Sequence, residues 1–257
     1  MVHSLRAIQK NPNIPSDRET PMRLRLAQLF CLGIVLSWCT AMAASAEPAN
    51  KAQDTSLRQS PRNVAIFVFQ GMELLDFAGP GEVFQAAGPQ FKVYSVGEST
   101  EPIVSQGFVK IIPEYSIQDC PKPDLLVIPG GDTSAPLKNL DVVAWVKGVS
   151  GEAEVTMSVC TGAFILAKAA LLDGQEATTH WFHLTRLGKA APDIQVRSKV
   201  RFVDTGRIVT TAGVSAGIDG ALHVVDRLLG HKAAVRVAKG MEYNWDEAGA
   251  DEDAASN

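Results

Sequence analysis

The residues with the clearest chemical potential surround Cys160. An apolar and β-branched run over 155–159 ends at this cysteine, and a helix-like segment follows, with the small residue Gly162 near its start. This pattern is typical of a cysteine nucleophile elbow, a sharp strand-to-helix turn at the carboxyl edge of a sheet. Backbone N–H groups at the start of the helix would face the sulfur, so we expect a lowered thiol pKa. A buried core cysteine is the alternative interpretation.

Two further loops carry residues that could assist a thiol at this edge. One contains Asp76, and the other contains Gly130, Gly131 and Asp132 after a buried apolar run. Loops that leave the carboxyl ends of parallel strands converge on one edge, where the carboxyl group could share a proton with sulfur and the glycine amides could bind developing charge. The structural alternatives are a first-turn acid in a helix entered through Pro80, and a simple tight turn.

The histidines offer one candidate for the site and no metal cluster. His180 could line the pocket as an acid or base, or it could hydrogen-bond locally at a strand-to-helix corner. We predict no metal site, because His183, His223 and His231 show no ligand spacing with acids or cysteines. Asp219 lies early in a predicted helix, where a negative charge favours the helix dipole.

Short apolar runs alternate with helical segments along the chain. The expected strands lie at 64–69, 91–96, 125–128 and 155–159, with a strand pair within 103–112 and a hairpin over 200–210 that turns at 204–206. The expected helices lie at 79–87, 135–149, 161–170, 216–229 and 232–239. This alternation predicts an α/β fold, a flavodoxin-like three-layer sandwich whose mostly parallel sheet is covered on both faces.

The amino-terminal region resembles a secretory signal peptide. Residues 22–46 combine two arginines, a long apolar stretch and an Ala-x-Ala ending at Ala46. We therefore expect cleavage after Ala46 and a periplasmic or secreted protein, whether translation starts at Met1 or Met22. An uncleaved membrane anchor is the alternative, against which the Ala-x-Ala site argues.

Four segments are expected: the leader 1–46, a polar linker 47–62, one domain over 63–245, and an acidic, disordered tail 246–257. Cleavage would remove five basic and two acidic residues, leaving 19 Lys and Arg against 26 Asp and Glu, a net charge of −7. We therefore predict no nucleic-acid partner and no membrane attachment after cleavage.

Two cysteines, Cys120 and Cys160, would persist in the mature chain. They could pair in an oxidising compartment. We expect free thiols instead, because Cys120 lies in a proline-rich loop, away from the elbow that holds Cys160.

From about Asn63 to Tyr243 the chain resembles the ThiJ/PfpI superfamily, which has the class I glutamine-amidotransferase-like fold. The matching motifs, in chain order, are LDFAGP (75–80), IPGG (128–131), SVCTG (158–162), LDG (172–174), ATTHW (177–181) and TAGVSAGID (211–219). Within the superfamily, the chain is similar to the isocyanide-hydratase-like branch and to the sensor domains of AraC-type regulators.

The resemblance implies roles for three residues. Cys160 would be the nucleophile, Asp76 its carboxylic partner, and Thr161 the residue that follows the nucleophile, as in isocyanide hydratases. Protease relatives place a histidine after the cysteine, and glyoxalase-like relatives use a glutamate in place of the aspartate, so neither activity is expected. The resemblance also implies a homodimer and a small-molecule substrate, with no cofactor.

Two functions from different classes follow. The first is a cysteine-dependent hydratase, a lyase that converts a small electrophilic isocyanide to an N-formamide. The alternative is an exported, non-catalytic domain that binds or senses a small ligand. We do not expect a transcription factor, because a DNA-binding segment of roughly 100 residues would have to follow the domain, and 14 residues follow Tyr243.

Overall fold

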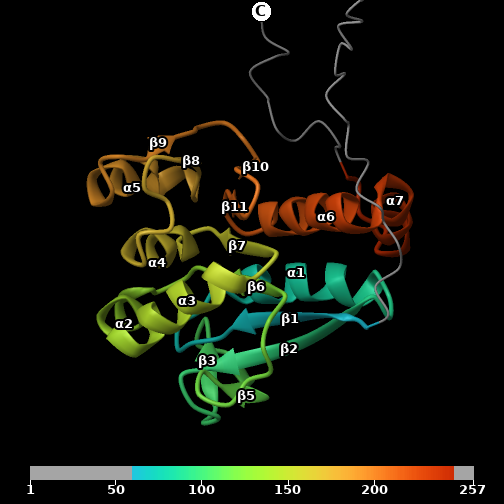
Figure 1. Ribbon diagram of the computed structural model, residues 1–257, viewed down its shortest axis with the longest axis horizontal. Helices are drawn as coiled ribbons and strands as arrows, with labels where there is room; N and C mark the ends of the chain where they lie inside the picture. Colours follow the sequence, from blue (N-terminus) through green and yellow to red (C-terminus); the bar gives the residue numbers. More distant parts are fainter. Residues whose placement is uncertain (1–59, 246–257) are drawn as a thin grey trace, which may run out of the picture. The chain divides into compact units, whose positions relative to one another are not determined.

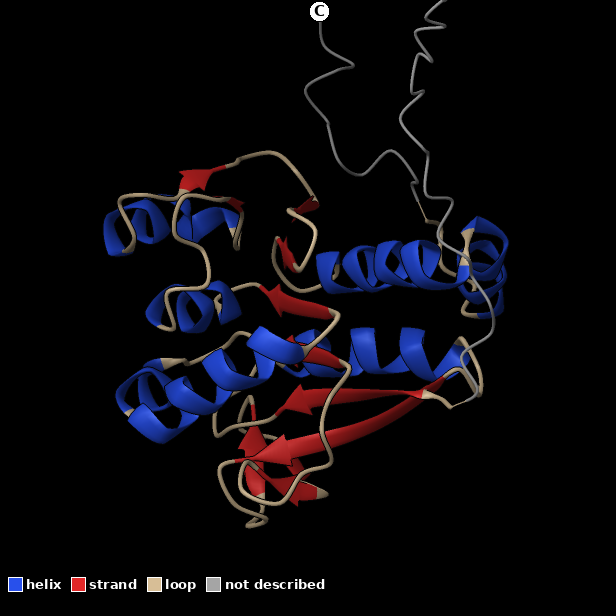
Figure 2. Ribbon diagram, in the orientation of Figure 1, coloured by secondary structure: helices blue, strands red, loops and turns tan. Residues whose placement is uncertain are grey.

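The computed structural model describes residues 60–245, which form a seven-stranded sheet with helices on both faces (Figures 1 and 2). The strand order is β10-β11-β7-β6-β1-β2-β5, and every neighbouring pair is parallel except β10 and β11. The strands are β1 Arg62–Phe67, β2 Phe91–Gly97, β5 Tyr115–Ser116, β6 Leu125–Ile128, β7 Val155–Val159, β10 Phe202–Asp204 and β11 Ile208–Thr211. The predicted α/β fold with a mostly parallel sheet is confirmed.

Seven α-helices are present within the described residues. They are α1 Leu74–Ala86, α2 Ser134–Lys138, α3 Leu140–Glu152, α4 Gly162–Lys168, α5 Leu184–Ala190, α6 Ala216–Leu229 and α7 His231–Gly240. Side chains of α1, α6 and α7 pack into one buried cluster, and side chains of α3, α4 and α5 pack into another. Parallel strands need this cover because both of their faces are apolar.

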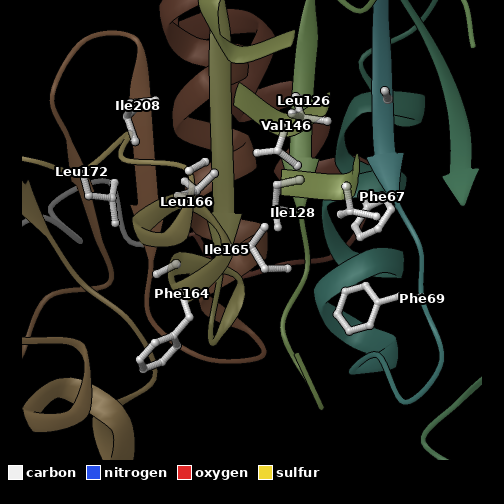
Figure 3. Packing of buried hydrophobic residues seen from close by; sticks show 14 of the residues in the cluster. Phe67, Phe69, Leu126, Ile128, Val146, Phe164, Ile165, Leu166, Leu172 and Ile208 are labelled. Carbon is white, nitrogen blue, oxygen red and sulfur yellow. The ribbon is translucent and has the colours of Figure 1, made fainter. Parts of the chain in front are cut away.

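The two clusters lie on opposite faces of the sheet. Along β1, Val64 and Ile66 belong to the cluster with α1 and α6, whereas Ala65 and Phe67 belong to the cluster with α3 and α4. This division follows from the two-residue period of a strand. Figure 3 shows the second cluster, in which Phe67 lies near Phe69 and the side chains of β6 meet those of α4.

The predicted hairpins are confirmed. β3 Ile103–Ser105 pairs antiparallel with β4 Val109–Ile111, and β10 turns back into β11 through Gly206, whose φ is 96°. A short parallel pair, β8 Glu176–Ala177 with β9 Gln195–Val196, and the 3₁₀ helix η1 Trp181–His183 were not predicted. Elements of two or three residues contain too few positions to show a period.

The predicted start of the first helix at residue 79 is wrong, because α1 begins at Leu74 and Pro80 lies inside it. The Gly79-Pro80 pair marks a close helix contact instead. A Cβ at Gly79 would lie 2.9 Å from Ile218 Cγ1 of α6. The early start places Asp76 in the first helical turn.

The single helix predicted over 135–149 is divided into α2 and α3 at Asn139. This residue has an extended backbone, and its side-chain oxygen accepts hydrogen bonds from the amides of Asp141 at 3.0 Å and Val142 at 3.3 Å. Asn139 therefore caps the amino terminus of α3 and ends α2.

The predicted leader, the tail 246–257 and the linker up to residue 59 lie outside the described residues. β1 begins at Arg62, one residue before the predicted start of the domain. Across residues 60–245, no helix is long and apolar enough to cross a membrane.

Asn139→Ala should lower the free energy of unfolding by about 1 kcal/mol, because two amides at the start of α3 lose their acceptor. Asn139→Asp should keep most of the stability, since its carboxylate can accept the same bonds. Urea denaturation of the three proteins measures the difference. Equal stability of the alanine and aspartate variants would contradict the capping role.

Candidate active site

Cys160 occupies a strained turn between β7 and α4. Its φ is 55°, a left-handed value that is uncommon for a residue with a side chain, and its side chain is buried. Two hydrogen bonds hold this backbone: Cys160 N donates to the carbonyl of Ala212 at 3.0 Å, and Thr179 Oγ1 donates to the carbonyl of Cys160 at 2.6 Å. The predicted elbow is confirmed.

Two glycines allow the neighbouring loop to approach the elbow. A Cβ at Gly162 would lie 2.1 Å from the carbonyl oxygen of Ile128, and a Cβ at Gly130 would lie 2.6 Å from both N and Oγ1 of Thr161. Neither distance leaves room for a side chain. The end of β6 and the start of α4 therefore touch through their backbones, which closes the site around the sulfur.

Thr161 joins the elbow to the glycine turn. Its hydroxyl donates to the carbonyl of Gly131 at 3.0 Å and accepts from the amide of Gly131 at 2.9 Å. The amide of Gly130 donates to Asp76 Oδ2 at 2.8 Å. Both glycine amides therefore already donate hydrogen bonds within the site. To bind a substrate as predicted, one of them would have to give up its present acceptor, Asp76 or Thr161.

The carboxyl group of Asp76 is fully buried in the first turn of α1. Oδ2 accepts from Gly130, whereas Oδ1 makes no hydrogen bond within residues 60–245. Burial raises the pKa of Asp76 to about 7, and the charge of Glu73 adds to this effect. The amides of Gly130 and Val214 and the Cys160 thiol oppose the shift by stabilising the carboxylate.

The predicted lowering of the thiol pKa is wrong. Burial raises the pKa of Cys160 to about 12, the negative charge of Asp76 adds to the rise, and the backbone amide of Thr161 opposes it. At neutral pH the sulfur therefore carries its proton, next to a carboxyl group that is near half ionisation. The two groups share protons as a unit.

Asp132 lies in the same loop but does not join the pair. Its side chain is exposed, and the carboxylate accepts hydrogen bonds from the amide of Ser134 at 3.1 Å and from the Ser134 hydroxyl. These bonds lower the pKa of Asp132. In this structure it shapes the turn into α2, and contact with a substrate stays a prediction.

His180 makes the local hydrogen bond that was the structural alternative to a role in the pocket. Nδ1 accepts from the amide of Phe182 at 3.3 Å, so the ring caps η1 at the predicted strand-to-helix corner. The same ring packs over Gly213, where an added Cβ would lie 2.1 Å from His180 Cδ2. His180 therefore contacts the loop next to the elbow, and its predicted role as a substrate-binding residue stays a prediction.

Sequence reasoning missed four residues that support the pair: Glu73, Thr179, Ala212 and Val214. Three of them, Thr179, Ala212 and Val214, fall in the motifs at 177–181 and 211–219, where the sequence predicted roles for His180 and Asp219 only. No local pattern reveals such roles, because Ala212 acts through its carbonyl and Val214 through its amide.

Cys120 and Cys160 are both free, as expected. Cys120 packs against the cluster in Figure 3, whereas Cys160 belongs to the cluster on the other face of the sheet. In the described part of the chain, no group of three or more His, Cys, Asp or Glu side chains is arranged to hold a metal ion.

Asp76→Asn should increase the rate at which iodoacetamide alkylates Cys160, because loss of the negative charge lowers the thiol pKa. In the wild type, the rate should rise about tenfold per pH unit from about pH 7 upward, as expected for a small thiolate fraction. Mass spectrometry of the Cys160 peptide measures both effects, with the Cys120 peptide as an internal control. A wild-type rate that levels off below about pH 8 would contradict the raised pKa.

Comparison with known proteins identifies the family of this chain. The model of the DJ-1/PfpI family matches residues 62–227. The isonitrile hydratase of Pseudomonas putida is 33% identical over 184 residues, which cover 70% of this chain and 78% of that protein. The Parkinson disease protein 7 homolog of Danio rerio is 26% identical over 183 residues, 68% of this chain and 94% of that protein.

Solved structures agree. A ThiJ/PfpI family protein from Pseudomonas syringae has a TM-score of 0.67 and 29% identity over 81% of this chain and 86% of its own. DJ-1beta from Drosophila melanogaster has the same fold, with a TM-score of 0.65 and 22% identity over 72% of this chain and 100% of its own. The chain therefore belongs to the DJ-1/PfpI family, as its motifs predicted.

Proposed function

We propose that the protein is a cysteine-dependent hydratase that converts a small isonitrile, also called an isocyanide, to an N-formamide. The observation that carries the proposal is a pair of buried groups at the elbow: Cys160, whose thiol stays protonated because burial raises its pKa, and Asp76, whose pKa burial raises to about 7. Such a carboxyl group can accept and return a proton at neutral pH. The 33% identity to an isonitrile hydratase supports this choice of substrate.

The first step adds the thiol across the terminal carbon of the isonitrile. Ionised Asp76 accepts the proton of Cys160 as the sulfur bonds to this carbon, and then delivers the same proton to the carbon. The S–H bond breaks while C–S and C–H bonds form, which yields a thioimidate. Because the proton leaves during the attack, the thiol does not have to be ionised beforehand, in agreement with its raised pKa.

The second step adds water to the thioimidate carbon. Ionised Asp76 accepts one proton of the water as the new C–O bond forms, and delivers that proton to the nitrogen, which leaves the carboxylate ionised again. The second water proton then passes through Asp76 to the sulfur as the C–S bond breaks. Formamide leaves, and both side chains regain their starting states. No change of oxidation state occurs in the protein.

The surroundings of the pair agree with this chemistry rather than with peptide hydrolysis. Thr161 follows the nucleophile, and its hydroxyl is bound on both sides to Gly131, so it supplies no base. Oδ1 of Asp76 has no partner within residues 60–245 and is available for proton transfer.

Cys160→Ser should reduce formamide production from an alkyl isonitrile by at least about 100-fold, because the hydroxyl is a much weaker nucleophile. Cys120→Ser removes the thiol on the other face of the sheet and should leave the rate unchanged. Chromatography of the formamide product measures all three proteins. A wild type that binds the isonitrile and releases no product would overturn the hydratase and favour the non-catalytic binding domain.

The value of kcat/KM should rise with pH through an apparent pKa near 7 and then reach a plateau. The sign follows from the active form: Asp76 must be ionised to accept the thiol proton, and its pKa is raised to about 7. Asp76→Asn should lower kcat by about 10²- to 10⁴-fold and remove this dependence. Activity that falls as pH rises from about 6 to 8 would contradict the assignment of Asp76 as the base.

A further inference from the structure

The loop formed by residues 212–215 is hydrogen-bonded to Cys160 and influences the ionisation of Asp76. The carbonyl of Ala212 accepts from Cys160 N at 3.0 Å, and the amide of Val214 stabilises the Asp76 carboxylate. Val214 has a φ of 53°, an outlier for a β-branched residue. A backbone in this region persists only where the surrounding structure holds it. The position of this loop therefore depends on contacts outside the loop.

Arg201 supplies those contacts at both ends of the loop. Its carbonyl accepts from the amide of Ala212 at 2.9 Å, and its Nη2 donates to Ser215 Oγ at 3.1 Å. Its Nε donates to Asp219 Oδ2 at 2.7 Å, in the first turn of α6. One side chain and its own backbone thus hold the loop between the hairpin and the helix.

Asp219 is the buried anchor of Arg201. The residue is 5% exposed, and both of its carboxylate oxygens are used: Oδ2 by Arg201, and Oδ1 by the hydroxyl of Tyr243 at 2.9 Å. The helix-dipole role expected for Asp219 is therefore only part of its function. A buried, charge-assisted hydrogen bond fixes an arginine much more firmly than a surface ion pair does.

A second ion pair joins the same hairpin to the other end of α6. Arg227 Nη1 lies 2.8 Å from Asp204 Oδ2, and Arg227 Nη2 donates to the carbonyl of Gly206 at 2.7 Å. His223 also contacts Asp204, at 2.6 Å. Within residues 60–245, these groups make no hydrogen bond to residues 212–215, so Arg227 provides a matched control for a purely structural effect.

We propose that Arg201 is a positioning residue for the Cys160–Asp76 pair, acting through Asp219 and the loop 212–215. The catalytic consequence rests on the proposed hydratase function, whereas the effect on ionisation of the pair does not. The titratable groups that face Asp76 are Glu73 and Cys160. Those that face Asp219 are Arg201 and Tyr243.

Arg201→Gln should raise the pKa of Asp76 by about one pH unit, because a displaced loop takes the amide of Val214, which favours the carboxylate, away from Asp76. The ionised fraction at about pH 7 would then fall about fivefold, and kcat/KM with it. Carbon-13 NMR of labelled aspartate follows the titration, and Asp76→Asn identifies its signal. Arg227→Gln should lower Tm without moving this titration.

Tyr243→Phe provides a milder test that keeps the arginine and its partner. Loss of one hydroxyl should shift the Asp76 titration in the same direction by a smaller amount, and this variant decides the matter if Arg201→Gln does not fold. The proposal is overturned if the titration stays at the wild-type value in both variants, or if Arg227→Gln moves it equally. A shifted titration in a protein that hydrates no isonitrile would reject the hydratase and retain the positioning role.

Discussion

The hydrogen bond from the Gly130 amide to the buried carboxyl group of Asp76 is the contact on which the rest of the site depends. It joins residues 54 positions apart, and it requires α1 to begin early enough to carry Asp76 in its first turn. It also requires a glycine at position 130, because a side chain there would displace Thr161. The elbow, the glycine turn and the first helix are thereby constrained together.

Burial rather than the helix dipole decides the ionisation of the sulfur. A helix terminus contributes roughly 0.3–1 kcal/mol to a nearby charge, which is less than one pKa unit. Full burial of an ionisable group can shift its pKa by up to about 3–5 units. The α4 helix is short, and the thiol is enclosed by the packed faces of β7 and α6, so the larger effect prevails and the thiol stays protonated. Chemistry at this site must therefore move a proton as the sulfur attacks.

Two backbone positions in the site have strained conformations. Cys160 and Val214 both have left-handed φ values. The backbone of Cys160 is held by Ala212 and Thr179, and the carbonyl of Val214 accepts from the amide of Gly217 at 3.2 Å. Rigid parallel strands beneath them make such conformations tolerable, because β7 and β11 are paired along four residues. The paired strands therefore hold the strained backbones of Cys160 and Val214 in position.

Short-range patterns in the sequence determined the main strands and the position of the elbow. The apolar runs specified the strands of a parallel sheet, and the step from 155–159 into Gly162 specified the elbow, because periodicity and steric limits act over a few residues. Motif order also identified the family and selected Cys160 and Asp76. These features need no knowledge of distant contacts.

Only the tertiary structure decided how the selected residues behave. The start of α1 at Leu74 depends on packing against α6, and the use of both glycine amides depends on which side chains reach them. The raised pKa of Cys160 depends on enclosure by segments far apart in the chain. The same holds for Arg201, whose partners lie 14 and 18 residues away. Burial and long-range hydrogen bonds arise only when the chain has folded, so no local pattern contains them.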